Sequence, residues 1–207
     1  MQILPVEEIE IDMAEIQVIE QTMKSTFRMI TFSREHLADD LLNNYLRRTT
    51  NLRELLSIKN AQMEAQNEEE AQAYMQTLQQ TLSFIIGEIK NQVNFETELQ
   101  LFQLFRSISP ESHINHPNRY RDKLVQIGSY VCPPPNEISS LVSQVFHNIQ
   151  QINNTVLRAI YFHHEMIRIH PFIDGNSRTT RLITFHLLRS QNIPIIDIPL
   201  GLLEDYL

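Results

Sequence analysis

The residues with the clearest capacity for chemistry lie between His170 and Arg181, in the stretch His-Pro-Phe-Ile-Asp-Gly-Asn-Ser-Arg-Thr-Thr-Arg. An imidazole, a carboxylate and two guanidinium groups stand here between two strongly apolar segments, where charged groups are costly unless they pair or serve a reaction. The run 174–176 precedes the second apolar segment, whose pattern predicts a helix. The first N–H groups of a helix are free and attract anions, so the spacing predicts a site that fits a phosphate.

Four side chains around that helix start are candidates for one phosphate-handling site. Arg178 and Arg181 are three positions apart on one helical face and form a clamp for a polyphosphate. Cations at a helix start oppose its dipole, so this pattern favours a bound polyanion over a purely structural role. Asp174 is the natural ligand for Mg²⁺ shared with the phosphates, and a role as helix cap is compatible with this. His170 can accept a proton from an incoming hydroxyl near neutral pH.

Other kinds of site are not indicated. His163 and His164 precede Glu165, but His164 and His170 are six positions apart, not the four of an H-E-x-x-H zinc site. There is no G-x-x-x-x-G-K-[ST] and no G-x-G-x-x-G motif, so the anion site is neither a P-loop nor a Rossmann pocket. The single cysteine, Cys132, excludes an intramolecular disulfide, and we expect it to be a small buried residue.

Composition limits the classes of function. The chain has 207 residues, 42% of them hydrophobic, which is enough for one well-buried core, and we expect one domain. The formal net charge of −8 and a pI near 5.5 argue against nucleic acid as a main partner, because nucleic-acid binders carry a clustered basic face. The sequence has no apolar stretch of about 18 residues and no basic leader, so we expect no membrane partner and a cytoplasmic location.

The elements that must position the chemical stretch are predicted to be mostly helical. From about residue 8 to about residue 106 the chain is rich in Leu, Gln, Glu, Met and Ala, with apolar residues three to four apart, which predicts several helices. Prolines and asparagines between Ser107 and Asn136 indicate a loop region. Within it, Leu124 to Val131 carries β-branched and aromatic residues around Gly-Ser, which favours a short hairpin.

Two buried helices are predicted to flank the site, with another before them. Asn136 is expected to cap a helix that runs to about Gln150, and Asn153 or Asn154 to cap one over residues 155–169. Pro171 should end the second helix. This helix and the one after residue 176 are apolar nearly all round, so we expect both to be central.

The stretch from His170 to Arg181 resembles the signature H-P-F-x-[D/E]-G-N-x-R-x-x-R of Fic-domain proteins, the filamentation-induced-by-cAMP family. The likeness covers roughly residues 94–197. It implies an all-α Fic fold, a helical bundle with a small β-hairpin flap. The flap and the segment after it are matched by Tyr120, Arg121, Val125, Ile127 and the prolines 133–135.

Carried over position by position, the resemblance implies a reaction. His170 would deprotonate a Ser, Thr or Tyr hydroxyl of a target protein for in-line attack on the α-phosphate of ATP, and Asp174 would hold Mg²⁺. Gly175 and Asn176 would line the anion hole, and pyrophosphate would leave. The hairpin Leu124 to Val131 would align the target segment as an added strand. The positions implied for the nucleotide are Gly175, Asn176, Ser177, Arg178 and Arg181.

Three features depart from the common form of the family. Ser177 stands where glycine or lysine is usual, and Thr180 replaces a frequent glycine. Neither change removes a catalytic atom, so adenylylation is expected rather than phosphorylation. The chain ends at Leu207, where relatives usually continue into a further helix, which leaves open whether the natural chain is longer.

Many such proteins carry an inhibitory helix with the pattern [S/T]-x-x-x-E-[G/N], whose glutamate pairs with the second arginine of the signature. The best match here, residues 60–65, places that glutamate at Glu64, although Asn60 and Ala65 both miss the pattern. Residues 50–55 fit the first five positions with Glu54. Glu64, Glu54 and an ordinary surface glutamate all remain open.

The sequence thus predicts an N-terminal helical layer over residues 1–90, which can be autoinhibitory, and a Fic core over residues 91–207. The predicted activity is that of a protein adenylyltransferase acting on MgATP and a protein hydroxyl, and a homodimer is compatible with it. One alternative is an enzyme of the same site that removes AMP or transfers another phosphate-linked group. The other is a noncatalytic regulatory binding module, which an intact signature disfavours.

Overall fold

A computed structural model describes residues 2–32, 84, 85, 87, 88, 91, 93–109 and 119–193 of the chain. These residues are mostly helical, with one two-stranded antiparallel sheet, which confirms the predicted all-α fold with a small hairpin. The elements in chain order are a 3₁₀ turn at Val6–Glu8, then α1 (Met13–Phe32), α4 (Glu98–Ile108), β1 (Gln126–Ile127), β2 (Tyr130–Val131), α6 (Pro135–Gln151), α7 (Thr155–Ile169) and α8 (Asn176–Arg189).

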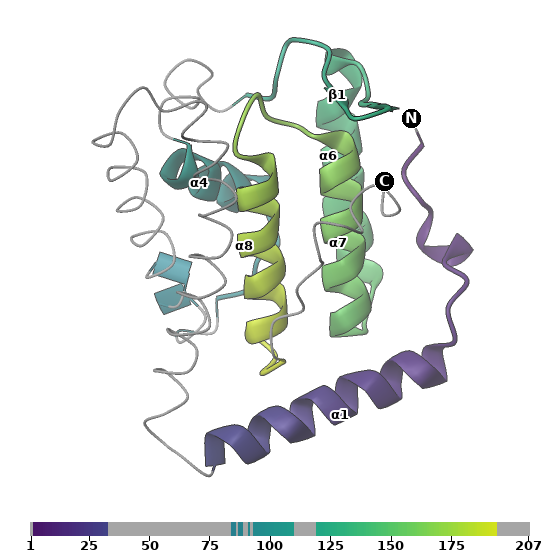
Figure 1. Cartoon of the computed structure of the whole chain (residues 1–207), viewed down its shortest axis with the longest axis vertical. Coiled ribbons are helices and arrows are strands. Elements are labelled where there is room, and N and C mark those ends of the chain that lie inside the picture. Colours follow the sequence, from purple (N-terminus) through teal and green to yellow (C-terminus); the bar gives the residue numbers. More distant parts are fainter. Residues whose placement is uncertain are drawn as a thin grey trace.

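The helices α7 and α8 form the centre of the described core. They lie side by side and are joined by the short loop 170–175, with α6 against α7 and α4 against α8 (Figure 1). The predicted central position of both helices is confirmed, because Phe162 on α7 and Ile183 on α8 are completely buried. Aromatic rings fill the space between the helices, and Phe95, Phe146 and Phe162 contact one another at centroid distances of 5.8–6.0 Å.

The ends of the helices follow local capping rules. Asn154 caps α7, since its side-chain oxygen accepts a hydrogen bond from the Leu157 N–H at 2.9 Å, as predicted. The predicted cap of α6 is wrong: the helix begins at Pro135 with Pro134 as its N-cap residue, and Asn136 already lies inside it. Proline suits the first helical position because its fixed φ fits the helix and it has no N–H that would need a partner.

The predicted hairpin is present, with Gln126 opposite Val131 and Ile127 opposite Tyr130. Gly128 makes the turn with a φ of +57°. The Cys132 N–H donates to the Val125 carbonyl at 3.0 Å and so extends the pairing beyond the strands. Cys132 is buried as expected, and this burial raises the pKa of its thiol.

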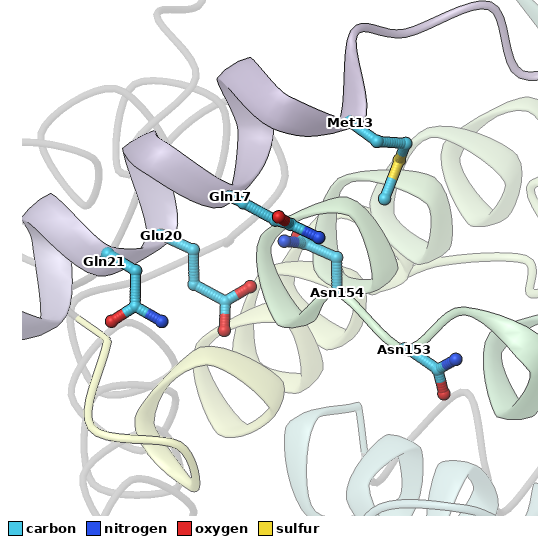
Figure 2. Close-up of a pocket in the computed structure, with 6 residues that line it drawn as sticks. All are labelled: Met13, Gln17, Glu20, Gln21, Asn153 and Asn154. Atoms are coloured by element: carbon cyan, nitrogen blue, oxygen red, sulfur yellow. The ribbon is translucent and has the colours of Figure 1, made fainter.

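Helix α1 crosses the end of α7 that is remote from the hairpin (Figure 1). Its Glu20 is nearly buried and accepts hydrogen bonds from the Thr155 N–H at 3.2 Å and from Lys24 Nζ at 2.5 Å. A groove lies between α1 and the loop before α7 (Figure 2). The groove is lined by Met13, Gln17, Glu20, Gln21, Asn153 and Asn154.

The described residues test only part of the predicted organisation. Within them, no helix is both long and apolar enough to cross a membrane. The candidate inhibitory residues Glu64 and Glu54 lie outside the described part of the chain, as does the end at Leu207. The boundary between a layer 1–90 and a core 91–207 therefore stays a prediction.

Candidate active site

His170 sits immediately after the last turn of α7, in a left-handed backbone conformation with φ of 50° and ψ of 60°. Its N–H donates to the Met166 carbonyl at 3.0 Å, which closes the helix. A residue with a β-carbon is uncommon at positive φ, and such positions concentrate at functional sites. The chain then turns through Pro171 toward α8, so the imidazole lies at the junction of the two central helices.

The loop after His170 is held by Asn176. The side-chain oxygen of Asn176 accepts from the Phe172 N–H at 2.8 Å, and its Nδ2 donates to the Phe172 carbonyl at 2.7 Å. The Phe172 ring in turn stacks on Phe105 of α4, with centroids 3.8 Å apart. Asn176 is buried. Its carboxamide therefore fixes the backbone of the loop at Phe172.

Gly175 is the N-cap residue of α8 and has a φ of +77°. A β-carbon at this position would stand 2.2 Å from Ser109 Oγ, so any other residue here would force the Ser109 side chain at the end of α4 to move. Because Gly175 has no side chain to cap the helix, the first N–H groups of α8 receive no bond from that position. Asp174 is exposed and is not the N-cap residue, so its alternative role as helix cap is wrong.

The remaining signature residues lie on α8 as their spacing predicts. Ser177 is exposed and Thr180 is buried, while Arg181 is half-buried. Arg178 belongs to the same first turns, but its side chain is outside the described structure. His170, Asp174 and the start of α8 therefore lie together at the junction of α7 and α8.

The imidazole of His170 is neutral at physiological pH. Burial is the main cause of a pKa lowered from 6.5 to about 4, and the positive charge of Arg121 acts in the same direction. The carbonyl of Ile167 and the carboxylate of Asp174 oppose the shift. Nδ1 is buried and meets no partner with full hydrogen-bond geometry in the described region. A neutral ring retains the lone pair that a base needs.

Arg121 is a residue that the sequence placed only within the flap. Its side chain is 2% exposed, and its guanidinium donates to the His170 carbonyl at 2.7 Å. The sequence carried no signal for this burial, because Arg119, Asp122 and Lys123 around it are exposed.

The hairpin and the loop 170–175 lie at the same end of the molecule (Figure 1). Leu124 and Val131 are 72% and 65% exposed on the hairpin, and Gln126 faces outward with them. No group of three or more metal-ligating side chains occurs among the residues that the structure describes.

A protein-family model described as the Fic/DOC family matches residues 97–188. This range contains the hairpin, α6, α7 and the signature loop, and the fold around it is that of solved Fic structures. Residues 97–188 form a Fic domain. The Fic match begins at the cap of α4 and ends one residue before the end of α8.

Curated relatives of this chain include proteins named protein adenylyltransferase Fic. The protein from Drosophila grimshawi is 37% identical over 84 residues, which are 39% of this chain and 17% of the relative. The protein from Culex quinquefasciatus is 28% identical over 121 residues, which are 56% of this chain and 24% of the relative. The matched part is thus about a sixth to a quarter of the length of these relatives.

Solved structures show the same Fic fold. A Fic domain containing signaling protein from Bacteroides thetaiotaomicron has a TM-score of 0.57 and 22% identity, covering 69% of this chain and 57% of that one. A Fic family protein from Desulfovibrio desulfuricans has a TM-score of 0.60 and 18% identity, covering 91% of this chain and 60% of that one.

Proposed function

We propose that this Fic chain is a protein adenylyltransferase, which transfers AMP from MgATP to a Ser, Thr or Tyr hydroxyl of a target protein and releases pyrophosphate. The observation that carries the proposal is a neutral, half-buried His170 fixed next to the uncapped start of α8. Attack of a hydroxyl on a phosphate group requires a base that takes the hydroxyl proton and, next to it, a site that binds the phosphate. The names of the curated relatives support the same reaction.

His170 acts as the general base. Because Nδ1 is buried, Nε2 is the ring nitrogen that can meet an incoming hydroxyl. As the hydroxyl oxygen bonds to the α-phosphorus, its proton passes to Nε2, and the bond from that phosphorus to the oxygen bridging to the β-phosphate breaks. The electron pair of that bond leaves on pyrophosphate. At pH 7 a base whose pKa is about 4 is already deprotonated, so no proton has to be removed from it first.

The nucleotide phosphates bind at the start of α8. The N–H groups of the first turn, which receive no hydrogen bond from a side chain of the N-cap residue, and the positive end of the helix dipole would attract them, and Arg178 and Arg181 add charge from the same helix. Ser177 is exposed at this turn, so its hydroxyl can also face the nucleotide.

Asp174 fits a role in holding Mg²⁺. Its carboxylate is exposed directly before the anion site, and Mg²⁺ in nucleotide sites commonly takes one or two carboxylates together with phosphate oxygens and water. When bound, Mg²⁺ neutralises phosphate charge.

The target segment docks on the flap as an added strand. The hairpin contains only β1 and β2, so its outer edges have no neighbouring strand among the described elements. Backbone pairing along such an edge places an extended segment without regard to most of its side chains. The inhibitory role of Glu64, with Glu54 as the alternative, and assembly as a homodimer belong to the same proposal.

The test is self-modification with ATP labelled at the α-phosphate, in the presence of Mg²⁺. Wild-type chain, His170→Ala, Glu64→Gly and the double variant are compared, with His164→Ala as a matched control, since His164 lies on α7 but away from the loop. Label should rise in Glu64→Gly, persist in His164→Ala and vanish wherever His170 is lost. Label that survives in His170→Ala rejects the base assignment. No label in any variant that still binds ATP points to a noncatalytic module.

A further inference from the structure

Arg121 is the largest fully buried side chain of the described chain. A buried guanidinium is costly unless its charge is balanced and its donors are satisfied. In the described region its hydrogen-bond partners are all backbone carbonyls, and no carboxylate is among them. This arrangement indicates that the guanidinium serves to hold backbone segments in place rather than to form an ion pair.

One set of partners is the end of α7. Nε donates to the His170 carbonyl at 2.7 Å, Nη2 donates to the Ile169 carbonyl at 3.2 Å, and the backbone N–H of Arg121 donates to the Pro171 carbonyl at 2.8 Å. Three consecutive carbonyls around the base are thus bound by one residue. The last carbonyls of a helix lack partners and carry its negative dipole end, so a cation is favourable here.

The other set of partners lies at the two ends of the hairpin, next to Lys123 and Pro133, which we call its feet. Nη1 donates to the Lys123 carbonyl at 2.6 Å, before β1, and Nη2 donates to the Pro133 carbonyl at 2.7 Å, after β2. Both ends of the flap therefore rest on the same guanidinium that holds His170. These contacts span 49 residues of sequence between Arg121 and His170.

We propose that Arg121 is a positioning residue that sets the flap at a fixed distance from the base His170. This inference rests on the proposed function, because the flap is where the target strand would lie. A guanidinium is planar and its donors point in fixed directions, so it transmits position between the two backbones. Lysine carries all its donors on one atom and cannot bridge both sets of carbonyls in the same way. Its charge also helps to keep His170 neutral.

If Arg121 positions the flap, its loss should affect the transfer of AMP and not the binding of the nucleotide. The phosphates would bind at α8, which contains none of the hydrogen-bond partners of Arg121 in the described structure. Transfer depends on the distance from the target hydroxyl to the base, and a misplacement of about 1 Å can reduce a rate about a hundredfold. Loss of Arg121 should therefore lower kcat and leave the KM for ATP nearly unchanged.

The experiment compares Arg121→Lys and Arg121→Met with wild type, and uses Arg119→Met as the matched control, because Arg119 is exposed two residues earlier. Each variant is first checked for cooperative unfolding by circular dichroism. In self-modification with α-labelled ATP, both Arg121 variants should lose about a hundredfold in kcat while the KM for ATP stays within about threefold. Arg119→Met should behave as wild type.

Hydrogen exchange gives a readout that does not need activity. The Cys132 amide, which pairs with Val125 at the feet of the flap, should exchange at least about tenfold faster in the Arg121 variants. The Phe162 amide, in the middle of α7, should be unaffected.

The two kinds of failure are distinguishable. A wild-type chain that never labels rejects the proposed function, while the exchange of Cys132 still decides whether Arg121 holds the flap. A folded Arg121→Lys variant with wild-type kcat, or with wild-type exchange at Cys132, overturns the proposal. Failure of both variants to fold also overturns it, since Arg121 would then be a residue of global stability.

Discussion

Gly175 provides a quantitative test of how the site is built. In Gly175→Ala the new β-carbon would stand 2.2 Å from Ser109 Oγ, 3.2 Å from Ser109 Cβ and 3.7 Å from a ring carbon of Phe105. The left-handed backbone alone costs a residue with a β-carbon about 1–2 kcal/mol. Overpacking of a tight interior site adds about 1–3 kcal/mol. We therefore expect Gly175→Ala to lower the free energy of unfolding by about 2–5 kcal/mol.

Two other substitutions separate these contributions. Gly128 also has a positive φ, but a β-carbon there would meet nothing within 4 Å, so Gly128→Ala measures the backbone cost alone. Ser109 Oγ is buried without a hydrogen-bond partner among the described residues, so Ser109→Ala by itself should change stability by less than about 0.5 kcal/mol. In the Gly175→Ala background it should recover about 1–2 kcal/mol, because it removes the shortest contact.

The assay is urea unfolding followed by the helical circular dichroism signal, with equal m-values required for the comparison. The reasoning is refuted if Gly175→Ala costs no more than Gly128→Ala. It is also refuted if Ser109→Ala recovers nothing, because the contact with α4 would then not be what demands glycine. Either result would mean that the loop moves away from α4 at little cost.

Two further predictions concern buried polar groups. Asn176→Ala should lower the free energy of unfolding in urea by about 2–4 kcal/mol, because it leaves the buried N–H and carbonyl of Phe172 without partners. The control Asn153→Ala, at an exposed position, should change it by less than about 0.5 kcal/mol. A loss under about 1 kcal/mol for Asn176→Ala would contradict this account. Burial lowers the pKa of His186 from 6.5 to about 4, and Glu88 is the carboxylate near it, with 3.6 Å from Nε2 to Oε2. Between these pH values the unfolded chain binds a proton that the folded chain does not, so stability should fall on acidification from about pH 6.5 to about pH 4, by about 3 kcal/mol at ~1.4 kcal/mol per pH unit. His170, whose pKa is lowered in the same way, adds to the pH dependence, so His186→Gln should make the slope shallower without abolishing it, and an unchanged slope would count against this account.

The sequence by itself determined the elements whose signals are local. Apolar periodicity predicted the two central helices, the Asn154 cap followed from its side-chain chemistry, and the Gly-Ser turn marked the hairpin. The signature from His170 to Arg181 was recognisable because its residues are consecutive and belong to one loop and one helix start. Each of these features depends on residues only a few positions apart, and such local interactions can be predicted from the order of residues in the sequence.

The cap assignments show where local rules compete. Asn136 is a good cap residue, but the prolines before it favour an earlier start, and α6 begins at Pro135. Asp174 is likewise a good cap residue, yet Gly175 takes that position, with a φ of +77° and a close approach to Ser109 that a β-carbon would crowd. The second case could not be decided from the sequence, since the end of α4 and the start of α8 are far apart in the chain.

Only the tertiary structure decided which polar residues are buried and against what. Arg121 has the sequence context of an exposed loop, but folding brings the end of α7 and both feet of the hairpin around its guanidinium. The same folding buries His170 beside that charge and lowers its pKa, so that the imidazole is neutral near pH 7. Burial and charge act through space rather than along the chain, so residue type and spacing marked His170 as a candidate base, while the fold set its pKa.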